Sequence, residues 1–170
     1  MLRRSLLTSA IAASLLTTFS LPAFATQVYE TDLVIIGGGL SGLAAAQSAV
    51  DQGAKPIVLE KEAALGGGGN FPEGSLGVGT RYQKEHNINT TVDQVLTAAL
   101  QYHHYRADPH VLRVLIEESG KTIDWVMDKG AQMRGIRTMY PKDESLMTWH
   151  LFKGGAAGII QRFAKEVRAK

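Results

Sequence analysis

The sequence contains no cysteine, and this absence excludes several kinds of site from the chain. Without thiols there is no disulfide bond, no thiolate zinc site, no iron–sulfur cluster and no covalently attached haem. The absence also agrees with an exported protein that avoids disulfide chemistry. The 18 basic and 16 acidic side chains give a net charge of only +2, and no sustained Lys/Arg block occurs in the sequence. A nucleic-acid partner is therefore not expected.

The first 25 residues have the pattern of an export signal. A basic start with Arg3 and Arg4 precedes a moderately apolar segment, and Ala23-x-Ala25 is the small-residue pattern that a signal peptidase cuts. Ser and Thr dilute the apolar segment, which favours a cleaved signal over a membrane anchor. The arginine pair resembles a twin-arginine signal, although ordinary signals also contain such pairs. We expect residues 1–25 to be a signal peptide, the only membrane-directed segment of a periplasmic or otherwise exported protein.

A glycine-rich turn follows the first apolar run after this signal. Leu33–Ile36 suits a strand that is buried on both faces, and small and apolar residues over 40–50 predict a helix packed tightly on a sheet. Between them, Gly37-x-Gly39-x-x-Gly42 has the spacing of the dinucleotide-binding fingerprint. The first glycine permits a tight turn, the second lets the backbone approach a pyrophosphate, and the third lets the helix approach the strand. The helix would then offer its unpaired N–H groups to the phosphates.

Glu60 ends a second apolar strand, 18 positions beyond Gly42. An acidic side chain at this point can accept hydrogen bonds from ribose hydroxyls and would repel a 2′-phosphate, which argues against NADP. A packing loop would explain the glycines alone, but not a strand, turn, helix, strand and acid in this order. The fingerprint does not choose between NAD and FAD, because both carry an adenosine pyrophosphate.

A second glycine cluster, residues 66–69, follows Glu60 and is followed by Asn70. With it, the sequence resembles the FAD-dependent oxidoreductase 2 family, which comprises fumarate reductase flavoproteins and relatives such as urocanate reductases and ketosteroid dehydrogenases. That family reads strand–GGGxxG–helix–strand–EK, then GGN, then a small-x-Gly segment beneath the flavin. The resemblance implies that FAD is the cofactor and that the matching residues hold it. These residues are Gly37, Gly38, Gly39, Leu40, Ser41, Gly42, Glu60, Lys61, Gly68, Gly69, Asn70, Ser75 and Gly77.

The resemblance also implies the fold class. It is an α/β fold, a Rossmann-like FAD-binding domain of the glutathione-reductase type that is incomplete at its C-terminus, with residues 26–170 as its amino-terminal part. A loop of Gly, Asn and Ser offers backbone donors without bulk, so an extended cofactor can lie along it. Phe71-Pro72 departs from the small polar residues of the family, which leaves the detailed flavin contacts open.

Residues 91–130 predict a helical segment, which in the family leads towards a capping region. Thr90 or Thr91 is expected to cap the first helix, and Asp108 the second, with a proline in the first turn. Gly120 is expected to end the second helix before a third, short one. The polar stretch before this segment is interpreted as a surface loop.

Three histidines, His103, His104 and His110, lie near the junction of these helices. A metal site needs several ligands on one face, but adjacent helical residues point in different directions. Carboxylate support is also missing nearby, so solvated or capping histidines are favoured and a metal site is not predicted.

His150 stands before a Gly-Gly-Ala turn that leads into a helix. Reductases of the family have a histidine here that helps to hold a substrate carboxylate. In those reductases Arg-Pro follows the histidine. The resemblance makes His150 a substrate-binding candidate, whereas the alternative from the residues alone is a structural histidine that orders the turn. Leu151 and Phe152 replace the Arg and Pro, which makes a larger or less charged acceptor than fumarate plausible.

These features together predict an exported FAD-dependent oxidoreductase acting on CH–CH groups. A hydride would pass between the flavin and an activated carbon–carbon bond of an organic acid or related small molecule. The catalytic residues are expected beyond Lys170, and electrons would come from an external carrier such as a cytochrome or another redox protein. The alternatives are a truncated, non-catalytic nucleotide-binding or interaction domain and an NAD-dependent dehydrogenase.

Overall fold

The computed structural model describes residues 27–139 and 145–169. Contacts within the chain define two units, Met1–Glu30 and Thr31–Lys170, and every described helix and strand belongs to the second. The predicted signal peptide, residues 1–25, lies outside the described residues. Within the part that is described, every helix is too short or too polar to cross a membrane.

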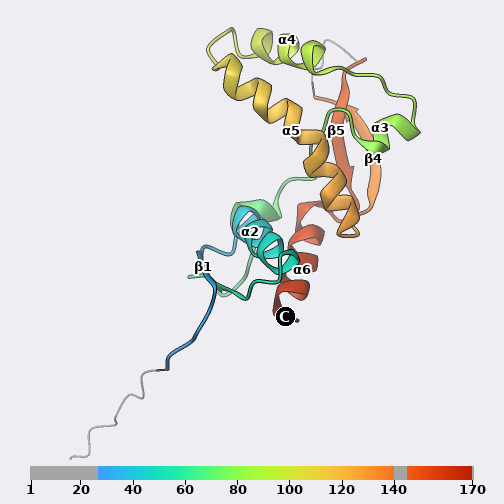
Figure 1. The fold of residues 1–170 in the computed structure, drawn as a ribbon. Helices are drawn as coiled ribbons and strands as arrows, with labels where there is room; N and C mark the ends of the chain where they lie inside the picture. Colours follow the sequence, from blue (N-terminus) through green and yellow to red (C-terminus); the bar gives the residue numbers. More distant parts are fainter. Residues whose placement is uncertain (1–26, 140–144, 170) are drawn as a thin grey trace, which may run out of the picture. The chain divides into compact units, whose positions relative to one another are not determined.

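The second unit begins with a β-α-β element (Figure 1). Strand β1 (Leu33–Ile36) pairs in parallel with β2 (Pro56–Leu59), and helix α2 (Leu40–Asp51) connects them. The predicted strand, helix and second strand are therefore present. Parallel strands require such a crossover, and the apolar residues of α2 that face inward supply the contact.

The prediction that the first strand is buried on both faces is wrong for the described residues. Ile35 faces α2, but Val34 and Ile36 point to the opposite face and are 52% and 89% exposed. Side chains alternate across a strand, so a helix on one face covers only every second residue. The described residues leave the other face of this two-stranded sheet largely uncovered.

A second sheet is antiparallel, with strand order β3-β5-β4. Its strands are β3 (Gly74–Leu76), β4 (Met133–Thr138) and β5 (Met147–Phe152). The short helix η1 (Gly67–Asn70) precedes β3, and α6 (Gly155–Arg168) follows β5 after the predicted Gly-Gly-Ala turn. Helices α2 and α6 pack side by side (Figure 1).

Two apolar clusters hold the unit together. The larger one joins α2, α5 (Pro109–Asp128), β5 and α6, and the ring of Trp125 lies 5.2 Å from that of Phe163. The smaller one lies between α4 (Val92–Tyr102), α5 and the chain after β3. Its members are Val78, Val95, Leu96 and Ile116. The clusters meet along α5, which contributes to both.

The predicted helix starts are confirmed. Thr91 accepts the backbone N–H of Gln94, whose side chain in turn accepts the N–H of Thr91, and this reciprocal cap begins α4. Asp108 accepts the N–H groups of His110 and Val111 at the start of α5. Local sequence is sufficient here, because each cap involves residues within one turn.

Two of the local predictions are wrong. Helix α5 does not end at Gly120 but continues to Asp128. The glycine is explained by close packing instead, since a Cβ atom there would lie closer than 3.0 Å to the carbonyl oxygen of Val78. The polar stretch predicted as a loop contains a short helix, α3 (Arg81–Glu85). Thr80 and Gln83 cap it reciprocally, and both side chains are buried.

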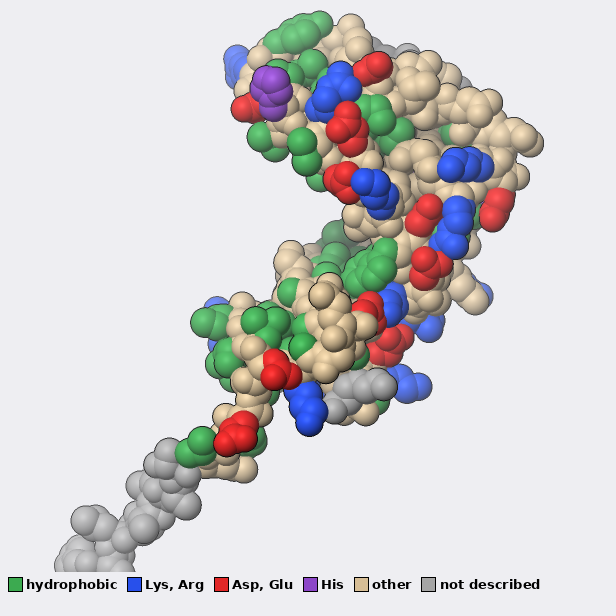
Figure 2. All heavy atoms as spheres, in the orientation of Figure 1, with side chains coloured by type: hydrophobic (Ala, Val, Ile, Leu, Met, Phe, Trp, Pro, Cys, Tyr) green, Lys and Arg blue, Asp and Glu red, His purple; other side chains and the backbone are tan. Residues whose placement is uncertain are grey.

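Charged side chains of both signs are interspersed on the surface. Figure 2 shows Lys and Arg next to Asp and Glu on the face that it views. Arg113, for example, bridges to Asp93 on the neighbouring helix and to Glu117 one turn further along its own. This distribution agrees with the small net charge.

Candidate cofactor site

The amino-terminal end of α2 is free of side-chain caps. Gly39 is the N-cap residue in an extended conformation, and among the described residues no side-chain cap accepts a hydrogen bond from the first turn. The first hydrogen bond of the helix runs from the N–H of Leu43 to the carbonyl of Gly39. The preceding N–H groups, at Leu40, Ser41 and Gly42, have no partner within the helix, which makes this end a suitable position for an anion.

Glycines bring the helix close to the preceding turn. Gly37 has φ = +101°, a conformation that L-amino acids with side chains rarely adopt. A Cβ atom at Gly42 would lie closer than 3.0 Å to the carbonyl oxygen of Gly37 and 3.4 Å from Ile35. The spacing of the glycines predicted this close approach of helix and strand.

Glu60 links the end of β2 to the first glycine turn. One carboxylate oxygen accepts the N–H of Gly38 at 2.6 Å, and the other accepts the N–H of Glu62 at 2.9 Å. Hydrogen bonds from the backbone of Glu62 and Gly38 lower the pKa of this carboxyl, so it is ionised at neutral pH. Lys61 is exposed and pairs with Glu62 at 3.4 Å. Glu60 thus presents a fixed negative charge beside the free end of α2.

The second glycine cluster lies against the first. The N–H of Gly66 donates to the carbonyl of Gly38 at 2.8 Å, and Gly39 and Gly66 form a parallel bridge. Gly69 fits between α2 and α6, because a Cβ there would lie 2.8 Å from Leu40 and 3.2 Å from Ile160. The two loops, which α2 and β2 separate in the sequence, therefore form one continuous backbone surface.

Asn70 stabilises this surface by hydrogen bonds to the backbone of its own loop. Its side-chain amide donates to the carbonyls of Leu65 and Gly67, at 3.1 and 3.3 Å. Gly68 is exposed, and nothing lies within 4 Å of the position of a Cβ there. The loop is held in shape by its own amide side chain and keeps an open face of backbone. The arrangement of free helix N–H groups, exposed glycine backbone and a neighbouring carboxylate fits an extended dinucleotide.

Ser75 and Gly77 lie on the other sheet. Ser75 is exposed on β3, opposite His150 on β5. Gly77 is buried, and a Cβ there would lie 2.8 Å from the His150 ring and 2.9 Å from Ile123. The described contacts join these residues to His150 rather than to the two glycine loops.

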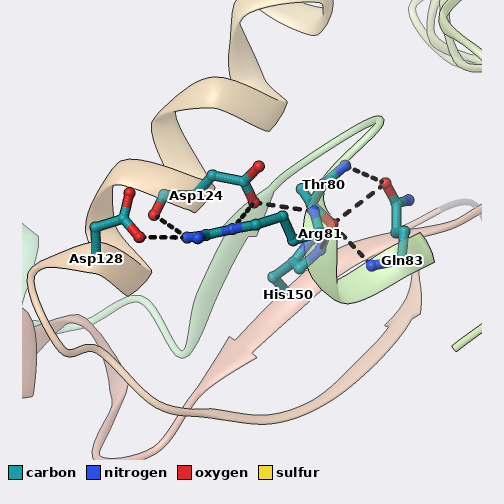
Figure 3. Close-up of polar contacts among 6 residues, drawn as sticks. All are labelled: Thr80, Arg81, Gln83, Asp124, Asp128 and His150. Atoms are coloured by element: carbon teal, nitrogen blue, oxygen red, sulfur yellow. Dashed lines mark hydrogen bonds and ion pairs between the residues drawn. The ribbon is translucent and has the colours of Figure 1, made fainter. Parts of the chain in front are cut away.

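His150 is fully buried and has a partner at each ring nitrogen, of which Thr80 is drawn in Figure 3. Nδ1 lies 3.0 Å from the carbonyl oxygen of Thr148, and Nε2 lies 2.8 Å from the hydroxyl of Thr80. Burial lowers the pKa of the ring, which favours its neutral form. These contacts match the alternative of a structural histidine; the substrate role of His150 stays a prediction.

Sequence reasoning missed the partners of His150. Thr80 and Gln83 have the spacing of a capping box, which would have indicated a helix start at this point. Gln83 also donates to the carbonyl of Met147, and Arg81 contacts Asp124 and Asp128 of α5 (Figure 3). These links between α3, α5 and β5 depend on contacts between residues more than 40 positions apart and have no local sequence signal. Among the described residues, no group of three or more potential ligand side chains is placed to hold a metal.

The chain is similar to several known proteins. Residues 32–161 match the family model described as "FAD binding domain". Vinyl phenol reductase of Lactiplantibacillus plantarum is 35% identical over 76% of this chain and 26% of its own length. NADH:fumarate oxidoreductase of Klebsiella pneumoniae is 31% identical over 77% of this chain and 15% of its own length. The chain thus spans about a quarter or less of these curated relatives.

Solved structures agree on the fold. The open conformation of a flavocytochrome c3 fumarate reductase superposes with a TM-score of 0.68 over 97% of this chain and 28% of that chain, at 20% identity. A 3-ketosteroid-Δ4-(5α)-dehydrogenase from Rhodococcus jostii gives a TM-score of 0.67 over 86% of this chain and 38% of that chain, also at 20% identity. The predicted α/β, Rossmann-like fold is confirmed. The chain belongs to the FAD-binding domain family of the fumarate reductase type, and its cofactor is FAD.

Proposed function

We propose that this chain is the FAD-binding part of a reductase that transfers a hydride to an activated carbon–carbon double bond. The observation that carries the proposal is the contact between the two glycine loops, through Gly66 and Gly38, beside the uncapped end of α2. A packing loop has no need of a second glycine loop against the first. A long cofactor with a diphosphate at its centre uses both.

The residues of the two loops have distinct parts in this proposal. Gly39, Leu40, Ser41 and Gly42 offer backbone N–H groups to the pyrophosphate at the positive end of α2. Glu60 accepts ribose hydroxyls with the oxygen lone pairs that its backbone partners leave free. Gly68, Gly69 and Asn70 form the backbone surface along which the rest of FAD lies, and Ser75 and Gly77 belong to the predicted segment beneath the flavin.

The chemistry follows from the cofactor and from the relatives. Bound FAD supplies hydride transfer, while the protein orients the substrate and excludes water. The relatives are named as reductases of vinyl phenol, fumarate, digoxin and acrylate, and these substrates differ widely in size and charge. Leu151 and Phe152, in place of the Arg-Pro of the reductases, favour a less charged substrate than fumarate. His150 is the substrate-side candidate that the resemblance provides.

Export and the electron carrier belong to the same proposal. Residues 1–25 would direct the protein to the periplasm, with the twin-arginine route as one option. The chain has no cysteine for haem attachment, so electrons would come from another protein, another domain or a small carrier. A relative from Shewanella frigidimarina is named fumarate reductase (cytochrome), which supports a cytochrome as one candidate partner.

Binding of FAD to the full chain tests the proposal. Titration with FAD, followed by flavin fluorescence and visible circular dichroism, should show saturable binding that NAD does not displace. Gly39→Val should abolish it, because Gly39 has φ = −73° and ψ = −177°, which valine adopts, so the fold persists while a side chain blocks the approach to α2. Gly158→Ala on α6 is the matched control and should bind FAD as the wild type does.

A second measurement separates the reductase from a non-catalytic nucleotide-binding domain. The chain, loaded with FAD, is assayed without oxygen with reduced viologen and a panel of compounds that contain activated double bonds. Turnover supports the reductase outright. Saturable FAD binding without turnover would favour the non-catalytic alternative for these 170 residues, and displacement of bound cofactor by NAD would favour an NAD-dependent dehydrogenase.

A further inference from the structure

The chain that continues from the predicted flavin segment Ser75–Gly77 is held by hydrogen bonds from three other elements. Its backbone N–H groups donate to acceptors on β5, α5 and α3. The acceptors are the carbonyl of Thr148 for Gly77 (2.9 Å), the hydroxyl of Ser119 for Val78 (3.1 Å), the amide of Gln83 for Thr80 (3.1 Å) and the carboxylate of Asp124 for Arg81 (3.0 Å). This segment, residues 77–81, is thus held by one backbone carbonyl and three side chains that follow it or lie in α3.

The His150 ring is placed directly behind this segment. The side chain is fully buried, and the space for a Cβ at Gly77 is filled by its ring atoms at 2.8 Å. Its neighbour Tyr82 lies at 6.0 Å between ring centroids, and the carboxylate that acts on the ring is that of Asp124 on α5. A residue without the ring would leave a cavity at the point where β3 ends.

The partners of His150 define its tautomer. The carbonyl oxygen of Thr148 only accepts, so Nδ1 carries the proton and donates to it at 3.0 Å. Nε2 of the neutral ring then accepts the hydroxyl proton of Thr80 at 2.8 Å. The oxygen of Thr80 in turn accepts the N–H of Gln83 at 3.0 Å as the cap of α3. Each hydrogen bond in this series has one direction, and the series links β5 through Thr80 to the first turn of α3.

We propose that His150 is a positioning residue that, as the neutral Nδ1–H tautomer, fixes Thr80 and through it residues 77–81, which continue from the predicted flavin segment Ser75–Gly77. The proposal rests on the proposed function for the cofactor, and on the described contacts for the tautomer. It assigns His150 to the support of the flavin segment, whereas the family resemblance assigns a histidine at this place to the substrate. His150 acts through its hydrogen bond with the hydroxyl of Thr80, and Ser119 of α5 holds the same segment through its hydrogen bond with Val78.

Nitrogen-15 NMR of the full chain without FAD tests the tautomer directly. The spectrum of His150 should show a protonated Nδ1 and an unprotonated Nε2, and the ring should not titrate in the range of ordinary histidines. The exposed His110 provides a reference ring signal in the same spectrum. A proton on Nε2, or a second proton taken up by the His150 ring at neutral pH, would overturn the proposal whether or not the chain binds FAD.

Binding measurements test the positioning role. Thr80→Val removes the hydroxyl and should weaken FAD binding about tenfold, equivalent to about 1.4 kcal/mol, while Thr80→Ser should bind as the wild type does. His150→Gln keeps an acceptor that can reach Thr80 and should retain most of the affinity; His150→Leu should lose as much as Thr80→Val, and the double variant should lose no more than either. Equal affinity of Thr80→Val and wild type, or full additivity in the double variant, would overturn the role. Failure of the wild type to bind FAD would instead refute the proposed function and leave the NMR result to decide the tautomer.

Discussion

Gly120→Ala is expected to destabilise this chain, although the same change stabilises an ordinary helix. Gly120 lies in the interior of α5, where alanine is favoured over glycine by about 1 kcal/mol. In α5, however, the added Cβ would lie closer than 3.0 Å to the carbonyl oxygen of Val78 and 3.2 Å from its carbonyl carbon. Both are backbone atoms held in place, so relief requires that α5 move away from the segment after β3.

The magnitude follows from the two opposing effects. Overlap of this kind in a packed interior costs about 3 kcal/mol, at the upper end of the usual range, because no flexible side chain can give way. Alanine's helical preference offsets about 1 kcal/mol of this cost. The net loss is about 2 kcal/mol, which for a chain of this size lowers the melting temperature by about 4–8 °C. The hydrogen bond between Val78 and Ser119, at 3.1 Å, would lengthen with the same movement.

Urea and thermal unfolding of the full chain, followed by circular dichroism, measure the effect. Gly158→Ala in α6 is the matched control, because the nearest atom to its added Cβ is the carbonyl oxygen of Lys153 at 3.4 Å, an ordinary contact. This control should gain up to about 1 kcal/mol. If Gly120→Ala proved as stable as the wild type or more so while the control behaved as expected, the close approach of α5 to Val78 would be refuted.

Three further predictions concern the caps, the glycine turn and pH. Asp108→Ala should lower the free energy of unfolding by about 1 kcal/mol in urea, whereas Asp108→Asn should keep the cap and lose little; equal losses would contradict a capping role. Gly42→Ala should cost about 1–3 kcal/mol in the same assay and also abolish FAD binding, because its Cβ would overlap the carbonyl of Gly37; retained binding would exclude the close approach. Burial lowers the pKa of His150 from its ordinary value of 6.5, so as the pH falls below 6.5 the unfolded chain takes up the proton first. Its contribution to stability is therefore complete above that pH and decreases below it, by at most about 1.4 kcal/mol per pH unit. His150→Gln should remove this slope in unfolding curves recorded across that range, and an unchanged slope would assign it to other groups.

The sequence alone was sufficient for the features that depend on neighbouring residues. The spacing of Gly37, Gly39 and Gly42 predicted the turn and the free helix end, because both result from backbone conformation within a few positions. Asp108 and Thr91 predicted helix starts for the same reason, since a cap is made within one turn of its helix. The two glycine clusters and Glu60 carried the resemblance to the family, and the resemblance implied the fold class and the cofactor.

Contacts between distant segments were decided by the tertiary structure. Gly120 has the sequence appearance of a helix stop, and only the approach of Val78, 42 positions earlier, shows that the helix continues through it. The apolar side chains of Val34 and Ile36 led to the prediction of a buried face, but burial depends on which elements cover that face. His150 is a substrate candidate by its place in a motif, yet its environment is set by Thr80 and Gly77, both about 70 positions away. A capping motif or a glycine turn is determined by the residues that form it, whereas the environment of a side chain is determined by the distant segments that pack against it.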